Sequence, residues 1–140
     1  MANSVKAFRC EHTLRDLREG LEHVHQEAEA ALAAHGFDDG AKFAIRLAIE
    51  EAVVNAFRHG NRSDPKKSVH FRAYIDDTRA SFEVEDEGPG FDPATIPDPT
   101  EDENLEIPSG RGVMLIKAYM TEVEYVPPGN LLRMTYRKPA

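Results

Sequence analysis

Three short segments of the sequence carry residue types that could do chemistry, and the first is a polar row on a predicted helix. Glu51, Asn55 and His59 follow one another at intervals of four residues, so on an α-helix they lie beside one another along its apolar face. An amide oxygen can be a ligand for Mg²⁺, and a carboxylate can orient or deprotonate a hydroxyl nucleophile. A solvated helix face is the commoner interpretation of an isolated Glu-x-x-x-Asn pair. His59 fits either a helix-terminal histidine favoured by the helix dipole or a direct participant.

The second segment is Asp86-Glu87-Gly88-Pro89-Gly90, which follows a predicted strand. Counted along the alternating residues 80–84, Asp86 falls on the inward face, where a carboxylate is costly unless it accepts hydrogen bonds. The exocyclic amine of adenine is a donor of this kind, and Gly88 and Gly90 would let the backbone approach a flat ring. An ordinary turn explains the segment equally well, because Asp and Gly are common in turns.

The third segment is Ser109-Gly110-Arg111-Gly112, directly before the apolar run 113–116. Glycines that open a helix leave its first N–H groups free to bind phosphate oxygens, and Arg111 could add positive charge. We count all four residues as candidate nucleotide contacts, although a plain loop-to-helix junction explains them too. Neither glycine-containing segment matches the dinucleotide or P-loop patterns, which disfavours a Rossmann domain and a P-loop.

The helices that would position these segments are predicted from apolar spacing. A strand over 5–10 is followed by a helix with Thr13 as its N-cap and Gly36 as its C-cap. A second helix begins near Asp38 or Asp39 and runs to about His59. A third helix is expected from Gly112 to Met120, after a loop over 87–109.

Two hairpins complete the predicted fold. Alternating apolar residues indicate strands over 69–75 and 80–84, and again over 122–126 and 131–137, with Pro127-Pro128-Gly129-Asn130 as the second turn. The order of strand, two helices, hairpin, loop, helix and hairpin predicts an α+β fold. We expect a two-layer α/β sandwich with a mixed, mostly antiparallel sheet and helices on one face.

Composition limits the function classes. A chain of 140 residues with 41% hydrophobic content suits one domain over 1–140. A net charge of −8 disfavours nucleic acid and anionic lipid as partners. The apolar runs are too short to span a membrane, and no signal peptide is visible, so a cytoplasmic location is expected.

Cys10 is expected to be structural, and His23 and His25 are expected to be surface residues. Cys10 is the only cysteine, so it cannot form an internal disulfide, which fits a reducing compartment. His23 and His25 stand two residues apart on a predicted helix. They should therefore diverge, fail to chelate one metal together, and lie on the surface.

In this order, the segments 51–60, 86–90 and 110–112 resemble the N, G1 and G2 boxes of the gyrase/Hsp90/histidine-kinase/MutL ATPase superfamily. Within it, the likeness is greatest to the anti-sigma-factor serine kinases, and it covers nearly the whole chain. The resemblance implies the Bergerat ATP-binding fold, with ATP held between helices and the loop that joins the last two boxes.

The resemblance also implies roles for the candidate residues. Glu51 would be the general base, Asn55 the Mg²⁺ ligand, and Asp86 the acceptor for the adenine amine. Gly88 and Gly90 would shape the adenine pocket, and the glycines at 110 and 112 would meet the triphosphate. Where sensor kinases often carry lysine, this chain has Arg58, which would contact phosphate.

The resemblance implies an ATP-dependent protein-serine kinase that phosphorylates an anti-sigma antagonist and inhibits a sigma factor. Its cofactors would be ATP and Mg²⁺, and its assembly would be a homodimer.

Two alternatives stay open. A nucleotide-binding module that sequesters a partner and catalyses little is favoured by five acids that would repel a triphosphate, Asp98, Glu101, Asp102, Glu103 and Glu106. A detached sensor-kinase domain that phosphorylates histidine would need a histidine-bearing partner.

Overall fold

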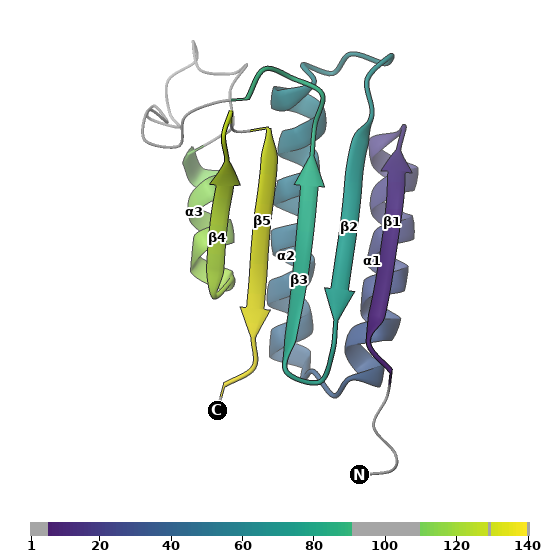
Figure 1. Ribbon diagram of the computed structural model, residues 1–140, viewed down its shortest axis with the longest axis vertical. Coiled ribbons are helices and arrows are strands. Elements are labelled where there is room, and N and C mark those ends of the chain that lie inside the picture. Colours follow the sequence, from purple (N-terminus) through teal and green to yellow (C-terminus); the bar gives the residue numbers. More distant parts are fainter. Residues whose placement is uncertain (1–5, 91–109, 129, 140) are drawn as a thin grey trace.

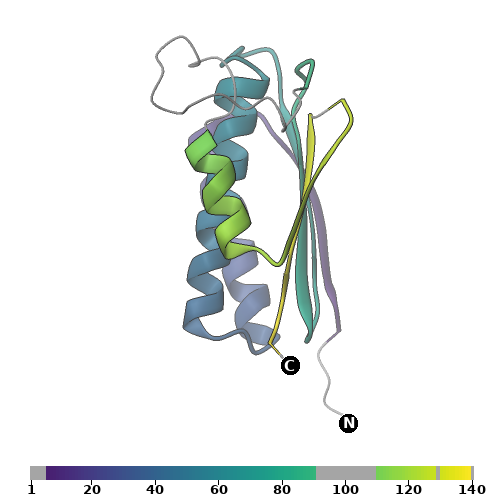
Figure 2. The ribbon, with the colours of Figure 1, turned by 90° about the vertical axis from the view of Figure 1, so that its left-hand side faces the viewer.

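The computed structural model describes residues 6–90, 110–128 and 130–139, with the backbone alone for 110–113. Its elements form two layers, with the helices on one face of the sheet (Figure 1, Figure 2). The helical layer holds α1 (Leu17–Ala34), α2 (Asp39–Asn55), the π-helix η1 (Ala56–Gly60) and α3 (Gly110–Tyr119). The sheet holds β1 (Phe8–Leu14), β2 (Val69–Ile75), β3 (Arg79–Glu85), β4 (Glu122–Val126) and β5 (Leu131–Arg137).

The five strands lie in the order β1-β2-β3-β5-β4, so the α+β two-layer class predicted from the sequence is confirmed. Every pair of described strands is antiparallel, and the parallel pairing that a mixed sheet would include does not occur among them. Both predicted hairpins are confirmed. The turn between β2 and β3 is held by Asp76, whose side chain accepts hydrogen bonds from the backbone N–H groups of Thr78 and Arg79.

The start of the first helix differs from the prediction. Thr13 does not cap it, because β1 continues to Leu14. Leu14 is paired with Val69 in the register of β1 and β2, and its side chain is buried. Asp16 is the N-cap instead, and its carboxylate accepts a hydrogen bond of 2.8 Å from the N–H of Glu19. Strand pairing therefore outweighed the helical spacing that placed Leu14 in the helix.

The far end of α1 agrees with the prediction. The cap residue is His35, and Gly36 follows it with φ at 75°. The N–H groups of Gly36 and Phe37 return to the carbonyls of Ala33 and Leu32. This pattern is a Schellman motif, in which glycine avoids the steric cost of a left-handed backbone.

The two histidines of α1 have different environments. His23 is exposed, as predicted. His25 is buried between α1 and α2, so the prediction of a surface position is wrong for it. Its Nε2 lies 3.8 Å from Glu50, and burial lowers its pKa because the protonated ring loses hydration.

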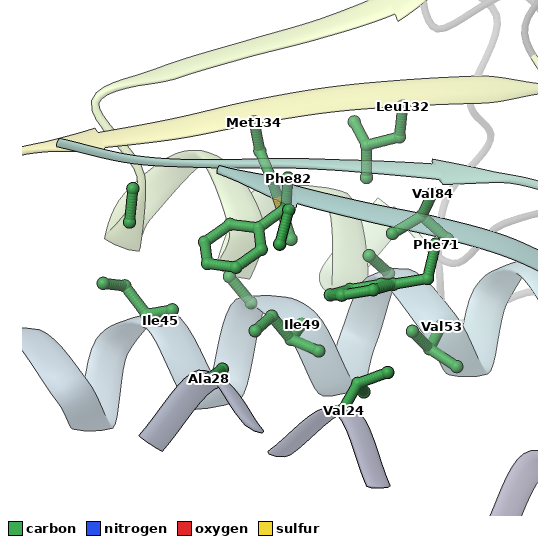
Figure 3. Close-up of a cluster of buried hydrophobic side chains, with 14 of the residues drawn as sticks. Val24, Ala28, Ile45, Ile49, Val53, Phe71, Phe82, Val84, Leu132 and Met134 are labelled. Carbon is green, nitrogen blue, oxygen red and sulfur yellow. The ribbon is translucent and has the colours of Figure 1, made fainter. Parts of the chain in front are cut away.

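The core lies between the layers (Figure 3). Apolar side chains from one face of each helix meet the inward residues of β2, β3 and β5. Burying one such side chain contributes roughly 1.5–3 kcal/mol. The residues shown at its centre are Val24, Ala28, Ile45, Ile49, Val53, Phe71, Phe82, Val84, Leu132 and Met134.

The second helix extends as far as predicted, but its last turn is not α-helical. Asp38 caps its start by accepting from the N–H of Ala41 at 2.8 Å. After Asn55 the chain forms η1, where the N–H of Asn61 donates to the carbonyl of Ala56, five residues earlier. Single π turns of this kind occur often at functional sites. The position of His59 therefore cannot be derived from α-helical spacing.

The third helix packs against α2 beside β4 (Figure 2). It begins at Gly110, two residues before the predicted start at Gly112, and buries Ile116. Among the residues that the structure describes, none of the helices is long and apolar enough to cross a membrane.

Candidate functional site

The predicted Glu/Asn pair lies in the last turns of α2. The exposed fraction of Asn55 is only 8%, and no described residue accepts a hydrogen bond from its buried Nδ2 atom. Glu51 is half-buried and lies one turn earlier on the same side of the helix. A buried amide without a partner costs roughly 1–3 kcal/mol. This side of α2 therefore carries a polar group that packing alone does not explain.

Asp86 lies directly against Gly60, the last residue of η1. A Cβ atom built on Gly60 would overlap the Asp86 carboxyl group and stand 2.7 Å from its Oδ1. Gly88 has no more space for a side chain than Gly60, because a Cβ atom on Gly88 would overlap the Gly60 carbonyl oxygen. Only glycine fits at both positions while this arrangement holds. The inward direction of Asp86 that strand alternation predicted is the one observed.

The two oxygens of the Asp86 carboxylate differ in the hydrogen bonds that they accept from the described residues. Its Oδ1 accepts from the N–H of Gly88 at 2.8 Å, and no described residue donates to Oδ2. Burial raises the pKa of Asp86 to about 6, and the negative charge of Glu85 adds to that rise. The Gly88 N–H and the Lys67 charge act in the opposite direction. A carboxyl group whose pKa is strongly shifted, and one of whose oxygens can accept a further hydrogen bond, is typical of a binding site.

Two asparagines that the sequence did not single out hold this loop. Asn61 is 1% exposed, donates to the Ser68 carbonyl at 2.9 Å and accepts from the Glu87 N–H at 2.7 Å. Asn130 pairs with the Asp86 backbone, accepting from its N–H at 2.9 Å and donating to its carbonyl at 3.1 Å. Asn61 directly follows Gly60, and that adjacency was the signal that could have identified it.

The remaining predicted residues are placed as follows. Arg58 is exposed on η1 and His59 is half-buried there. Gly90 has φ at 84°, a backbone that other residues rarely adopt. The segment Gly110–Gly112 forms the first turn of α3. Ser109 and the acidic loop residues lie outside the described residues.

The segments that carry the candidate residues meet at one end of the molecule. The end of α2, the end of β3 and the start of α3 lie at the same end of the two layers (Figure 1). The first N–H groups of α3 have no partner within the helix, and the helix dipole makes them attractive to anions. The site thus combines an acceptor for an amine, a carboxylate–amide pair and a helix start suited to phosphate.

The fold and the site define a two-layer α+β domain with the features of a nucleotide site. A family model described as a histidine kinase-like ATPase domain matches residues 14–136. The chain therefore belongs to this family, as the resemblance implied.

Curated relatives with the name anti-sigma F factor match part of the chain. That of Oceanobacillus iheyensis is 32% identical over 85 residues, which are 59% of this chain and 58% of the relative. That of Geobacillus thermodenitrificans is 37% identical over 82 residues, 56% of each protein. The chain therefore matches less than two thirds of the length of these relatives.

A solved structure supports the fold. The crystal structure of the RsbU and RsbW domains of a Mycobacterium tuberculosis protein superimposes with a TM-score of 0.62 at 20% identity. The match covers 97% of this chain and 34% of that one. The likeness extends through almost all of this chain, including both layers.

Proposed function

We propose that this domain binds Mg²⁺-ATP and transfers the γ-phosphoryl group to a serine of a protein antagonist, as an anti-sigma regulator. The observation that carries the proposal is the Asp86 carboxylate, held against Gly60 with Oδ1 bonded to Gly88 and with no described residue donating to Oδ2. An inward carboxylate with one free oxygen matches the exocyclic amine of adenine. Asp86 is therefore assigned to adenine, with Gly88 and Gly90 beside the ring.

The phosphoryl end of the site is assigned to α2, η1 and α3. The side chain of Asn55 is buried, and its amide oxygen would suit the oxygen ligand set that Mg²⁺ prefers. When bound, Mg²⁺ would neutralise charge on the phosphate oxygens. Arg58 and His59 are assigned to phosphate contacts, as are Ser109, Arg111 and the glycines at 110 and 112.

Glu51 is assigned as the general base. It accepts the proton of the serine hydroxyl while the serine oxygen forms a bond to the γ-phosphorus and the bond to the β,γ-bridging oxygen breaks, releasing ADP. The half-buried position of Glu51 one turn from Asn55 supports this role, because it places base and metal ligand on one side of the helix.

The partners are proposed from the relatives, which bear the name anti-sigma F factor. A sigma factor would be the inhibited protein and a serine-bearing antagonist the phosphoryl acceptor. We further propose a cytoplasmic location, a homodimer, and one domain over residues 1–140.

The test is phosphoryl transfer from γ-labelled ATP to the antagonist protein of an anti-sigma F factor system, in the presence of Mg²⁺. Transfer of one acid-stable phosphoryl group to a serine, located by mass spectrometry, is the expected result. An acid-labile label on histidine would instead identify a detached sensor-kinase domain, because phosphohistidine hydrolyses in acid.

A module that binds nucleotide and sequesters its partner is the second candidate. It is favoured by the acids of the segment 98–106, which would repel a closing triphosphate. Such a module would bind both ATP and a sigma factor but would phosphorylate nothing. A sigma-factor pull-down run beside the transfer assay separates the two candidates.

A further inference from the structure

A group of metal-ligand side chains lies between β1 and α1, at the edge of the sheet opposite β4 (Figure 1). Cys10 and His12 stand two residues apart on β1, so both face the helices. Glu27 of α1 lies opposite them. One ligand atom of each of these three residues lies within 4.8 Å of the other two. All three side chains are half-buried.

A fourth donor lies next to this group. His12 Nε2 is 2.7 Å from Oε1 of Glu27, and His23 Nε2 is 3.7 Å from the other carboxylate oxygen. The rings of His12 and His23 meet edge to face, with centroids 4.6 Å apart. The Cys10 sulfur lies within 4.8 Å of a Glu27 carboxylate oxygen as well. Glu27 is thus the centre of a cluster of one thiol and two imidazoles.

We propose that Cys10, His12, His23 and Glu27 form a zinc site that joins β1 to α1. Sulfur, imidazole nitrogen and carboxylate oxygen are the ligands that Zn²⁺ takes in proteins, in tetrahedral geometry. Zinc–ligand bonds of about 2.0–2.3 Å place neighbouring ligand atoms roughly 3.3–3.7 Å apart. Among Cys10, His12 and Glu27 the observed separations, from 2.7 Å up to 4.8 Å, bracket that range, and His23 Nε2 lies 3.7 Å from Glu27 Oε2.

The exposure of the ligands suits metal entry. The side chains of His12, His23 and Glu27 are 27%, 51% and 32% exposed, so a metal ion can reach these donors, and His23 would have to turn toward the other three ligands. A deprotonated Cys10 and the Glu27 carboxylate would together balance the charge of Zn²⁺. This composition differs from the oxygen-rich set that Mg²⁺ prefers, so the two metals would not compete for one site.

A zinc ion between β1 and α1 would affect the stability of the fold. Within the part of the chain that the structure describes, β1 is an edge strand whose one neighbour is β2. A metal that binds both β1 and α1 would hold this edge strand to the helical layer, and binding to the folded state alone would raise stability. The described candidate nucleotide residues lie elsewhere, in α2, η1 and α3 and in the segment after β3. Zinc should therefore stabilise the fold without changing ATP affinity.

The experiment uses the tag-free full chain after removal of metals with a chelator. Zn²⁺ is titrated in competition with a chromogenic chelator, and Co²⁺ is used as a spectroscopic probe. One equivalent of Zn²⁺ should bind and raise the thermal midpoint. Co²⁺ should give the intense visible bands of a tetrahedral site together with a thiolate-to-metal charge-transfer band.

Matched variants assign the ligands. Cys10→Ser should abolish the charge-transfer band, and Cys10→Ser and Glu27→Gln should each weaken Zn²⁺ binding at least about tenfold. Glu22→Gln, an exposed position on the same helix, should leave binding unchanged. Circular dichroism verifies that each variant is folded. The proposal is overturned if the parent binds no stoichiometric Zn²⁺, or if folded Cys10→Ser and Glu27→Gln bind it as tightly as the parent.

Discussion

Gly60 at the end of η1 and Asp86 after β3 touch so closely that the side chain of one occupies the place where the other would carry a Cβ atom. The contact connects the helical layer to the sheet at the candidate nucleotide site. Because Gly88 packs on the carbonyl of the same Gly60, one glycine positions both the carboxylate and the turn that follows it.

Gly60→Ala should therefore displace Asp86. The added methyl group would overlap the carboxyl group, and overpacking of this kind costs typically 1–3 kcal/mol of stability. We expect lower stability in urea unfolding and loss of ATP binding in calorimetry. Gly40→Ala is the matched control, because its methyl group would meet only Asp38 Oδ1 at 3.6 Å. The control should be stabilised by up to about 1 kcal/mol. Equal ATP affinity in the Gly60 variant and the parent would remove this contact from the site.

Asp86→Asn should affect binding and stability in opposite directions. An amide that turns its NH₂ toward the adenine amine sets donor against donor, so ATP affinity should fall by roughly 10–100-fold. The raised pKa of about 6 means that the fold disfavours the charged carboxylate. Removing that charge should stabilise the ligand-free protein at pH 7 by about 1–2 kcal/mol, a value discounted for the partial exposure of Asp86. A variant that binds ATP normally would contradict the assignment to adenine.

The pH dependence of both properties follows from the same pKa. Because the folded-state pKa of Asp86 lies above the ordinary 3.8, the folded protein holds this proton more tightly. The contribution of Asp86 to stability is therefore lost as pH rises from about 4 to about 6. ATP binding should weaken below about pH 6, because protonation removes an acceptor. Asp86→Asn serves as the reference, since titration of the ATP phosphates is common to both proteins. Parallel pH profiles for the two proteins would show that Asp86 does not titrate as described.

Glu51→Gln should separate binding from transfer. Loss of a general base lowers rates by typically 10²–10⁴-fold, while ATP affinity should be unchanged. The measurement is single-turnover phosphoryl transfer to the antagonist protein. Glu50→Gln, the neighbouring exposed glutamate, is the control and should transfer normally. Equal rates for Glu51→Gln and the parent would exclude Glu51 as the base.

Asn61→Ala should loosen the Asp86 loop. Its amide bridges the buried Ser68 carbonyl and the partly buried Glu87 N–H, and truncation leaves both groups without that partner. Each unsatisfied group costs about 1–3 kcal/mol. We expect a lower free energy of unfolding and weaker ATP binding. Hydrogen exchange at the Glu87 amide should become faster, and unchanged protection there would contradict the bridging role.

The sequence predicted those features that local periodicity determines. Alternation placed Asp86 on the inward face, and spacing placed Glu51 and Asn55 on one helix face. Contacts between distant segments were not predictable from periodicity. The extension of β1 to Leu14 depends on its partner β2, and the burial of His25 depends on packing against α2. The π turn at η1 leaves no pattern in the helical spacing. Asn61 gains its role only because η1 and the loop after β3 meet.

The central claim is that this end of the fold binds Mg²⁺-ATP through Asp86 and Asn55. Its most direct test is calorimetric titration with ATP, with and without Mg²⁺, of the parent and Asp86→Asn at a pH above the titration of Asp86. We expect one site, tighter binding with Mg²⁺, and a loss of affinity of roughly 10–100-fold in the variant. No binding to the parent at millimolar ATP, or equal binding by both proteins, would contradict it.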